Sequence, residues 1–76
     1  MKALLDDKGV VTHLGDHYFS VSFASGPEQL FHIKELSKSD QKRLVPGAPV
    51  RLLVTRQTMA DGSVVRMQSI TVEDNP

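Results

Sequence analysis

The sequence predicts an all-β fold, a small barrel of five short antiparallel strands, and three features of the chain lead to this prediction. Apolar and β-branched residues alternate with polar ones at a period of two, most clearly in residues 18–23. Turn signals rich in Gly, Pro and Asp separate the strand-like blocks. The chain has 76 residues and no cysteine, so neither disulfides nor thiolate-bound metals can support its small core, which favours a closed architecture.

The first two strands are predicted to form a hairpin. Residues 9–14 are apolar and β-branched and predict the first strand, which residues 3–5 would begin earlier. Gly15 and Asp16 supply turn chemistry before the second strand, residues 18–23. The second strand has an apolar face of Phe19, Val21 and Phe23 and a polar face of Tyr18, Ser20 and Ser22. The apolar face is expected to meet the core.

A short third strand and a long polar connection follow. Residues 24–28 read as a loop and residues 29–33 as the third strand. Residues 34–45 are mostly polar, and Leu36 and Leu44 are their expected anchors in the core. This connection is therefore predicted to be irregular or to hold a short helix.

Serines mark where such a helix would begin. Either Ser37, or Ser39 together with Asp40, has the side-chain oxygen that caps a helix N-terminus. Pro46 and Gly47 then predict a tight turn that ends the connection.

The last two strands form a second predicted hairpin. Residues 50–55 read as the fourth strand and residues 63–72 as the fifth. Asp61 and Gly62 lie between them and suit a hairpin turn, because Gly readily adopts positive φ. Residues 73–76 are expected to fray.

Five short strands with a longer connection between the third and fourth suit a Greek-key barrel of the OB type, and an SH3-like barrel is the nearest alternative. The prediction is a single domain over residues 1–76. Closure of a barrel removes the exposed sheet edges that promote aggregation. A monomer is expected, or a weak homodimer that covers any edge left open.

The net charge of the chain is zero, but basic and acidic residues are unevenly distributed along the sequence. Nine basic residues match nine acidic ones. Residues 34–66 contain seven basic and three acidic residues, and the two ends of the chain carry the remaining acids. This distribution allows a one-sided basic face, and it equally allows charges scattered over a solvated surface.

The sequence also indicates whether the protein enters or crosses a membrane. No stretch approaches the roughly 20 apolar residues of a membrane helix. The N-terminus turns acidic at Asp6 and Asp7, too early for a signal peptide. A soluble, cytoplasmic protein without membrane contact is therefore expected.

Catalytic patterns are absent from the sequence. It has no Gly-rich phosphate loop and no His-Glu-x-x-His motif, so we expect no enzyme and no cofactor. A metal site built from His13, His17 and His32 is the remaining enzymatic alternative.

Four segments resemble the cold-shock domain family and, more loosely, its S1-type relatives. Residues 9–14 are similar to the family's opening Gly-x-Val-Lys-Trp-Phe, and residues 16–21 stand in the place of its Lys-Gly-Phe-Gly-Phe-Ile motif. Residues 30–36 are similar to Phe-Val-His-Phe-Ser-Ala-Ile, and residues 44–50 to a Leu-x-x-Gly-x-x-Val pattern. The resemblance spans the chain from Gly9 to about Val72.

The resemblance implies a barrel that binds single-stranded RNA or DNA with little sequence preference. Bases would stack on flat side chains while basic groups at the rim meet phosphates. Transferred position by position, the stacking residues are His13, Tyr18, Leu30 and His32, with Phe19 added if the register slips by one residue, and Lys34 and Arg56 are the phosphate contacts.

Departures from the family pattern leave a second use open. His13 replaces the family's Trp and Leu30 replaces a Phe, so binding is expected to be weak. The same face could instead dock a protein partner. Two plainer interpretations also apply: Phe19 belongs to the core, and His32 caps the turn after its strand.

Overall fold

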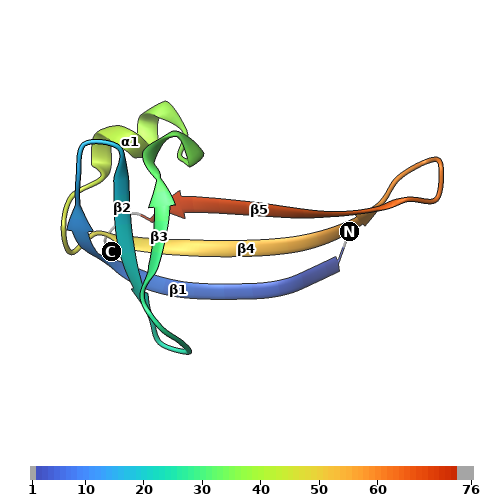
Figure 1. Cartoon of the computed structure of the whole chain (residues 1–76), viewed down its shortest axis with the longest axis horizontal. Helices are drawn as coiled ribbons and strands as arrows, with labels where there is room; N and C mark the ends of the chain where they lie inside the picture. The colour runs from blue at the N-terminus through green and yellow to red at the C-terminus, as the bar shows by residue number, and fades with distance from the viewer. Residues whose placement is uncertain (1, 74–76) are drawn as a thin grey trace.

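The computed structural model describes residues 2–73 and shows five antiparallel strands with little helix (Figure 1). The elements in chain order are β1 (Lys2–Leu14), β2 (Tyr18–Phe23), β3 (Gln29–His32), the 3-10 helix η1 (Ile33–Glu35), α1 (Lys38–Arg43), β4 (Pro49–Thr58) and β5 (Val64–Val72). The strands lie side by side in the order β3-β2-β1-β4-β5. The all-β fold and the short helix between β3 and β4 are therefore confirmed.

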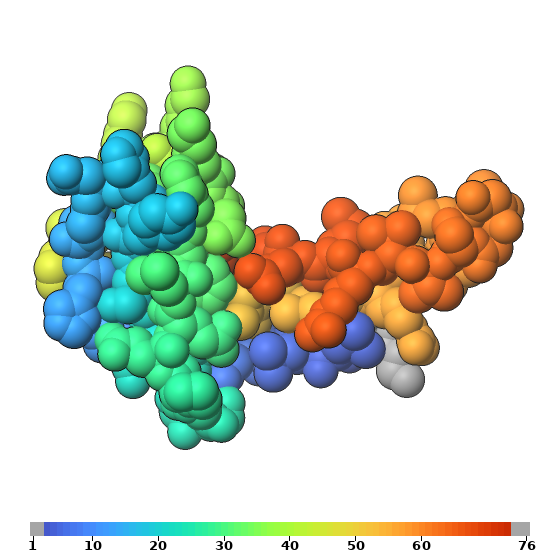
Figure 2. Space-filling model, in the orientation of Figure 1, coloured from blue at the N-terminus to red at the C-terminus, as the bar shows by residue number. Residues whose placement is uncertain are grey.

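The sheet has two parts, which we call the head and the arm. The arm consists of residues 2–6 and 53–69, a three-stranded extension that ends in the β4–β5 hairpin (Figures 1 and 2). The head is the rest of the described chain, where β2, β3 and the two helices gather. The molecule measures 41 × 26 × 24 Å. Its radius of gyration is 13.5 Å, against about 11.4 Å for a compact chain of this length.

The sheet is curled into a half-barrel and does not close, which corrects the expectation of a closed barrel. Among the described residues, β3 pairs with β2 alone and β5 with β4 alone, so these two strands are the edges. The reason lies in β3, which has four residues before the chain turns into η1. A strand that short cannot run along β5 and seal the barrel.

The core fills the inner face of the curled sheet beneath α1. Phe19, Phe23 and Phe31 are all buried there, as the alternation in β2 predicts, and Leu36 and Leu44 anchor the connection to β4 as expected. The rings of Phe19 and Phe31 stack at 5.6 Å between centroids. The remaining buried apolar residues are Val11, Val21, Ala48, Val50, Leu52, Val54, Ile70 and Val72.

β1 and β4 are longer than the sequence analysis predicted. β1 begins at Lys2 and runs without a break through Asp6, Asp7 and Lys8, which strand propensity disfavours. Cross-strand pairing explains this, because Arg51 of β4 donates two hydrogen bonds of 2.7 Å to the Asp6 carboxylate.

The predicted turns and caps are confirmed. The Ser37 hydroxyl accepts a hydrogen bond from the Asp40 N–H at 3.2 Å and caps α1. Gly47 and Gly62 have φ of 89° and 90°, as tight turns at these positions require. Within the described residues, no helix is long and apolar enough to cross a membrane.

Candidate functional site

The outer face of the head carries four of the predicted stacking residues close together. Tyr18 of β2 lies directly opposite His32 of β3. In the next row, Ser20 of β2 lies between His13 of β1 and Leu30 of β3. Because neighbouring residues in register share a face, these side chains line one surface. We call His13, Tyr18, Leu30 and His32 the platform.

Rings gather at one end of the platform. Tyr18 meets His32 edge-on, with 4.8 Å between centroids and 70° between planes. The ring of His17, in the β1–β2 turn, stacks on His32 with 6.4 Å between centroids and 30° between planes. Tyr18 is half exposed, and Leu30 is 68% exposed and extends the surface with an apolar side chain. His17 was not among the predicted site residues, although its position directly before Tyr18, in the turn, suggests that the two rings lie near each other.

The His32 ring is held in place by the start of η1. Its Nδ1 accepts a hydrogen bond from the Lys34 N–H at 3.0 Å, and Glu35 Oε2 accepts one from the His32 N–H at 3.0 Å. This reciprocal pair is a capping box, which confirms His32 as the cap of the following turn. Since Nδ1 is an acceptor, the proton of the neutral ring is on Nε2.

A carboxylate borders the opposite end of the platform. Glu28 accepts a hydrogen bond from the Thr12 hydroxyl and lies 3.5 Å from His13 Nδ1. The Thr12 hydrogen bond is the main reason that the pKa of Glu28 lies below its usual value. Glu28 is therefore negatively charged at neutral pH. No local sequence pattern marks Glu28, because its contact joins the β2–β3 loop to β1.

Phe19 does not belong to the site. It is 1% exposed and lies opposite Phe31 on the inner face of the sheet. The alternation in β2 is regular, so the register slip that would have moved Phe19 outward does not occur.

The two predicted phosphate contacts lie in different places. Lys34 is exposed and follows His32 in η1, at the edge of the platform. Arg56 lies in the arm, on the face that continues the row of Val54 and Leu52 and thus opposite to the Tyr18 face. The structure does not bring Arg56 to the platform.

The basic residues of the 34–66 region divide over several elements. Arg43 of α1 pairs with Asp40, and Arg51 of β4 with Asp6. Arg56 lies directly opposite Arg66 of β5, so two positive charges are neighbours in the arm. The platform itself has Lys34 beside it and the acidic Glu28 at its border.

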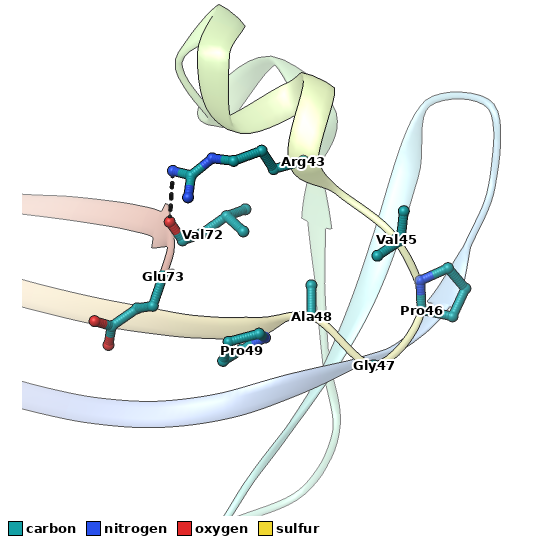
Figure 3. A pocket seen from close by; sticks show the side chains of 8 residues that line it. All are labelled: Arg43, Val45, Pro46, Gly47, Ala48, Pro49, Val72 and Glu73. Carbon is teal, nitrogen blue, oxygen red and sulfur yellow. Dashed lines mark hydrogen bonds between the residues drawn. The ribbon is translucent and has the colours of Figure 1, made fainter. Parts of the chain in front are cut away.

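A shallow hollow lies apart from the platform, beside α1 (Figure 3). Its volume is about 300 Å³, and the turn at residues 45–49 forms its floor with Arg43, Val72 and Glu73 around it. The Arg43 side chain joins α1 to the end of β5, because it donates a hydrogen bond of 2.9 Å to the Val72 carbonyl.

Within residues 2–73, no three His, Asp or Glu side chains gather in a way that could hold a metal ion. Comparison of the chain with protein-family models, with curated proteins and with solved structures found no match.

Proposed function

We propose that the platform binds single-stranded RNA or DNA with little sequence preference. The observation that carries this proposal is a ring cluster in which the exposed Tyr18 and His17 flank the half-buried His32, with the exposed Leu30 beside it. Stacking on such rings contributes about 1–3 kcal/mol per base and tolerates any base. The capping box fixes the His32 ring before a ligand arrives, which reduces the entropy lost on binding.

The fold supports this use of the platform. The OB arrangement is a partly open five-stranded barrel that binds oligonucleotides on the face of its second and third strands. This chain has five antiparallel strands in a curled sheet and a helix between β3 and β4. The platform lies mainly on β2 and β3, with His13 contributed by β1. We therefore propose an OB-type arrangement in which β3 and β5 are the edge strands.

The proposed contacts divide into stacking and charge. One base stacks on the exposed Tyr18 ring, beside the His32 ring that stands at 70° to it. The next base meets the apolar side chain of Leu30. Lys34 neutralises a phosphate at the edge of the platform. Affinity is expected to be weak, because the net charge of the chain is zero and Glu28 repels the nucleic-acid backbone.

Titration with fluorescent oligo-dT and oligo-U, at low and at physiological salt, tests the proposal. We expect saturable binding that weakens as salt is added, because phosphate contacts release counterions. Tyr18→Ala with His32→Asn should weaken binding by roughly ten-fold or more, given the energy of a stacked base. Asn retains an acceptor for the Lys34 N–H, so the fold should persist.

Two matched variants control this titration. Lys34→Gln should weaken binding and flatten its salt dependence, whereas Lys42→Gln, on the exposed side of α1, should do neither. Unchanged affinity in the ring variant, with its circular dichroism spectrum preserved, would overturn the proposed site.

A protein partner is the second candidate occupant of this face. The favouring observation is apolar exposure: Leu30 is 68% and Val10 is 46% exposed, and both belong to the outer face. Binding to a protein through these side chains would change little with salt. Absence of oligonucleotide binding at both salt concentrations would favour this alternative.

A further inference from the structure

The outer edge of β5 has a defined set of free backbone groups. The N–H of Glu73 donates to the Pro49 carbonyl at 2.8 Å, and the N–H of Met59 donates to the Ser63 carbonyl at 2.7 Å. Because the β4–β5 register is continuous between these bonds, odd-numbered residues of β5 bond to β4. The even-numbered residues therefore direct their N–H and C=O groups away from β4.

One end of this edge is already covered by α1. Asp40 accepts a hydrogen bond from the Val72 N–H at 3.3 Å, and Arg43 donates one to the Val72 carbonyl at 2.9 Å. No described strand pairs with the rest of the edge, which includes Val64, Arg66 and Gln68. Figure 2 shows open space beside it, in the angle between the head and the arm. Protein edges of this kind are usually paired or shielded.

The arm also exposes apolar side chains, although Val54 is buried and the Gln68 side chain donates a hydrogen bond to Glu35 of η1 at 3.2 Å. Most of the large apolar residues exposed in the described chain belong to the arm: Leu4, Leu5, Met59, Val64, Val65 and Met67. Met67 is 50% exposed and lies at the middle of the open edge. A three-stranded extension of this kind gains stability when another sheet or chain covers it.

The surface area agrees with a missing partner. The chain exposes 5387 Å², whereas a compact monomer of its mass exposes about 4,600 Å². The excess of about 800 Å² equals the area that each partner contributes to a standard protein–protein interface.

We propose that two copies of this chain dimerise by antiparallel pairing of their β5 edges, with the twofold axis at Met67. In this register Met67 meets its own copy, Arg66 lies opposite Gln68 of the second copy, and Val65 lies opposite Ser69 of the second copy. The sheets of the two arms become continuous. Arg66 and Gln68 exchange the N–H···O=C bonds that each lacks in the monomer.

Charge disfavours one alternative register of the β5 pair. β5 has one charged residue, Arg66, and pairing centred on Met67 places a neutral Gln opposite it. Pairing centred on Arg66 would oppose two like charges, which destabilises a strand pair. The chain as a whole has no net charge, so two copies approach without long-range repulsion.

Sedimentation equilibrium of the full chain measures the dimer directly. Between about 1 μM and 1 mM, the range that weak interfaces occupy, we expect the mass to rise from 8.4 kDa toward twice that value. Met67→Lys should raise the dimer Kd by at least roughly ten-fold, because it opposes like charges at the axis. The matched control is Met59→Lys, in the hairpin at the end of the arm, which should leave Kd unchanged.

A charge-exchange experiment tests the position of the axis. Met67→Lys and Met67→Glu should each be monomeric alone, and an equimolar mixture should restore a dimer. Restoration also excludes misfolding as the cause of the monomeric state. A mixture that remains monomeric while both variants keep the wild-type circular dichroism spectrum would overturn the proposed axis.

Amide hydrogen exchange gives an independent readout. The amides of Arg66 and Gln68 should be protected at high protein concentration and exchange rapidly on dilution. The Met67 amide bonds to Thr55 within one chain and should be protected at both concentrations. A wild-type chain that stays monomeric at 1 mM, or a dimer without this alternating protection, would overturn the proposal.

Discussion

His32 caps η1, and in the proposed function its ring also contacts a base. Its Nδ1 satisfies the Lys34 N–H while the ring contacts Tyr18 and His17. Sequence pattern indicated both roles as alternatives, because a His at the end of a strand suits either. The structure shows that the cap orients the ring, so the two roles are compatible.

Substitution separates these roles. His32→Ala should lower the free energy of unfolding by about 1 kcal/mol, the usual contribution of a capping side chain. His32→Asn should cost much less, because its amide oxygen can accept the same hydrogen bond. Urea denaturation measures both. An equal loss for Ala and Asn would show that ring packing, rather than the cap, stabilises this turn.

The negative charge of Glu28 is one reason to expect that the platform binds anions weakly. The Thr12 hydrogen bond keeps the pKa of Glu28 below its usual value, so the carboxylate stays charged well into mild acid. Glu28→Gln should raise affinity for oligo-dT at low salt by roughly two- to five-fold, the effect of one exposed charge. Glu73→Gln, at the far end of β5, is the matched control. Equal affinities for Glu28→Gln and the wild type would place the nucleic acid away from His13.

At the scale of elements, β1 is the strand that holds the sheet together. Its first half pairs with β4 and its second half with β2, and Gly9 and Val10 pair with both. Apolar periodicity located the second half. The first half is charged, and pairing with β4 decided its conformation.

The Asp6–Arg51 pair joins the charged half of β1 to β4 and predicts a response to acid. The Arg51 hydrogen bonds are the main cause of the lowered pKa of Asp6, whose ordinary value is 3.8. A carboxyl with a lowered folded-state pKa stabilises the fold above its unfolded pKa and loses that contribution as pH falls through the folded one. Arg51→Gln should therefore raise the pKa of Asp6 toward 3.8, measured by NMR titration, and reduce the loss of stability below about pH 4. An unchanged pKa would mean that the pair does not form in solution.

The shape of the whole molecule depends on Gly9, where β1 begins to pair with β2 and is still paired with β4. A Cβ atom at Gly9 would lie 2.6 Å from the Ser22 carbonyl oxygen, 2.7 Å from the Val21 side chain and 2.8 Å from Phe23. This close approach lets the end of β2 pair with β1 at a residue that also pairs with β4.

Gly9→Ala should therefore lower the free energy of unfolding by about 1–3 kcal/mol, the usual cost of overpacking a core. Thermal denaturation followed by circular dichroism measures it. Gly26→Ala is the control, because nothing lies within 4 Å of the position that its Cβ would take. Equal melting temperatures for the two variants would contradict the role of Gly9.

Much of the fold and part of the site follow from local pattern. Alternation in β2, the Asp61–Gly62 turn and the Ser37 cap are short-range signals, and each depends on residues that are near in sequence. Tyr18 and His32 were assigned as stacking residues by resemblance to the cold-shock family, and that role stays a prediction. Glu28 and His17 were missed as neighbours of the platform, because their contacts depend on how loops fold back on strands.

Local sequence predicts the central part of each strand, the turns between the strands and the side of β2 that enters the core, because these depend on side-chain period and turn chemistry. The added lengths of β1 and β4 come from pairing between the two strands. The open sheet and the position of Arg56 away from the platform became clear only from the tertiary structure. Closure depends on whether β3 can reach β5, and the face of a distant strand depends on its register. Both are set by pairings between residues far apart in the chain, which no local pattern specifies.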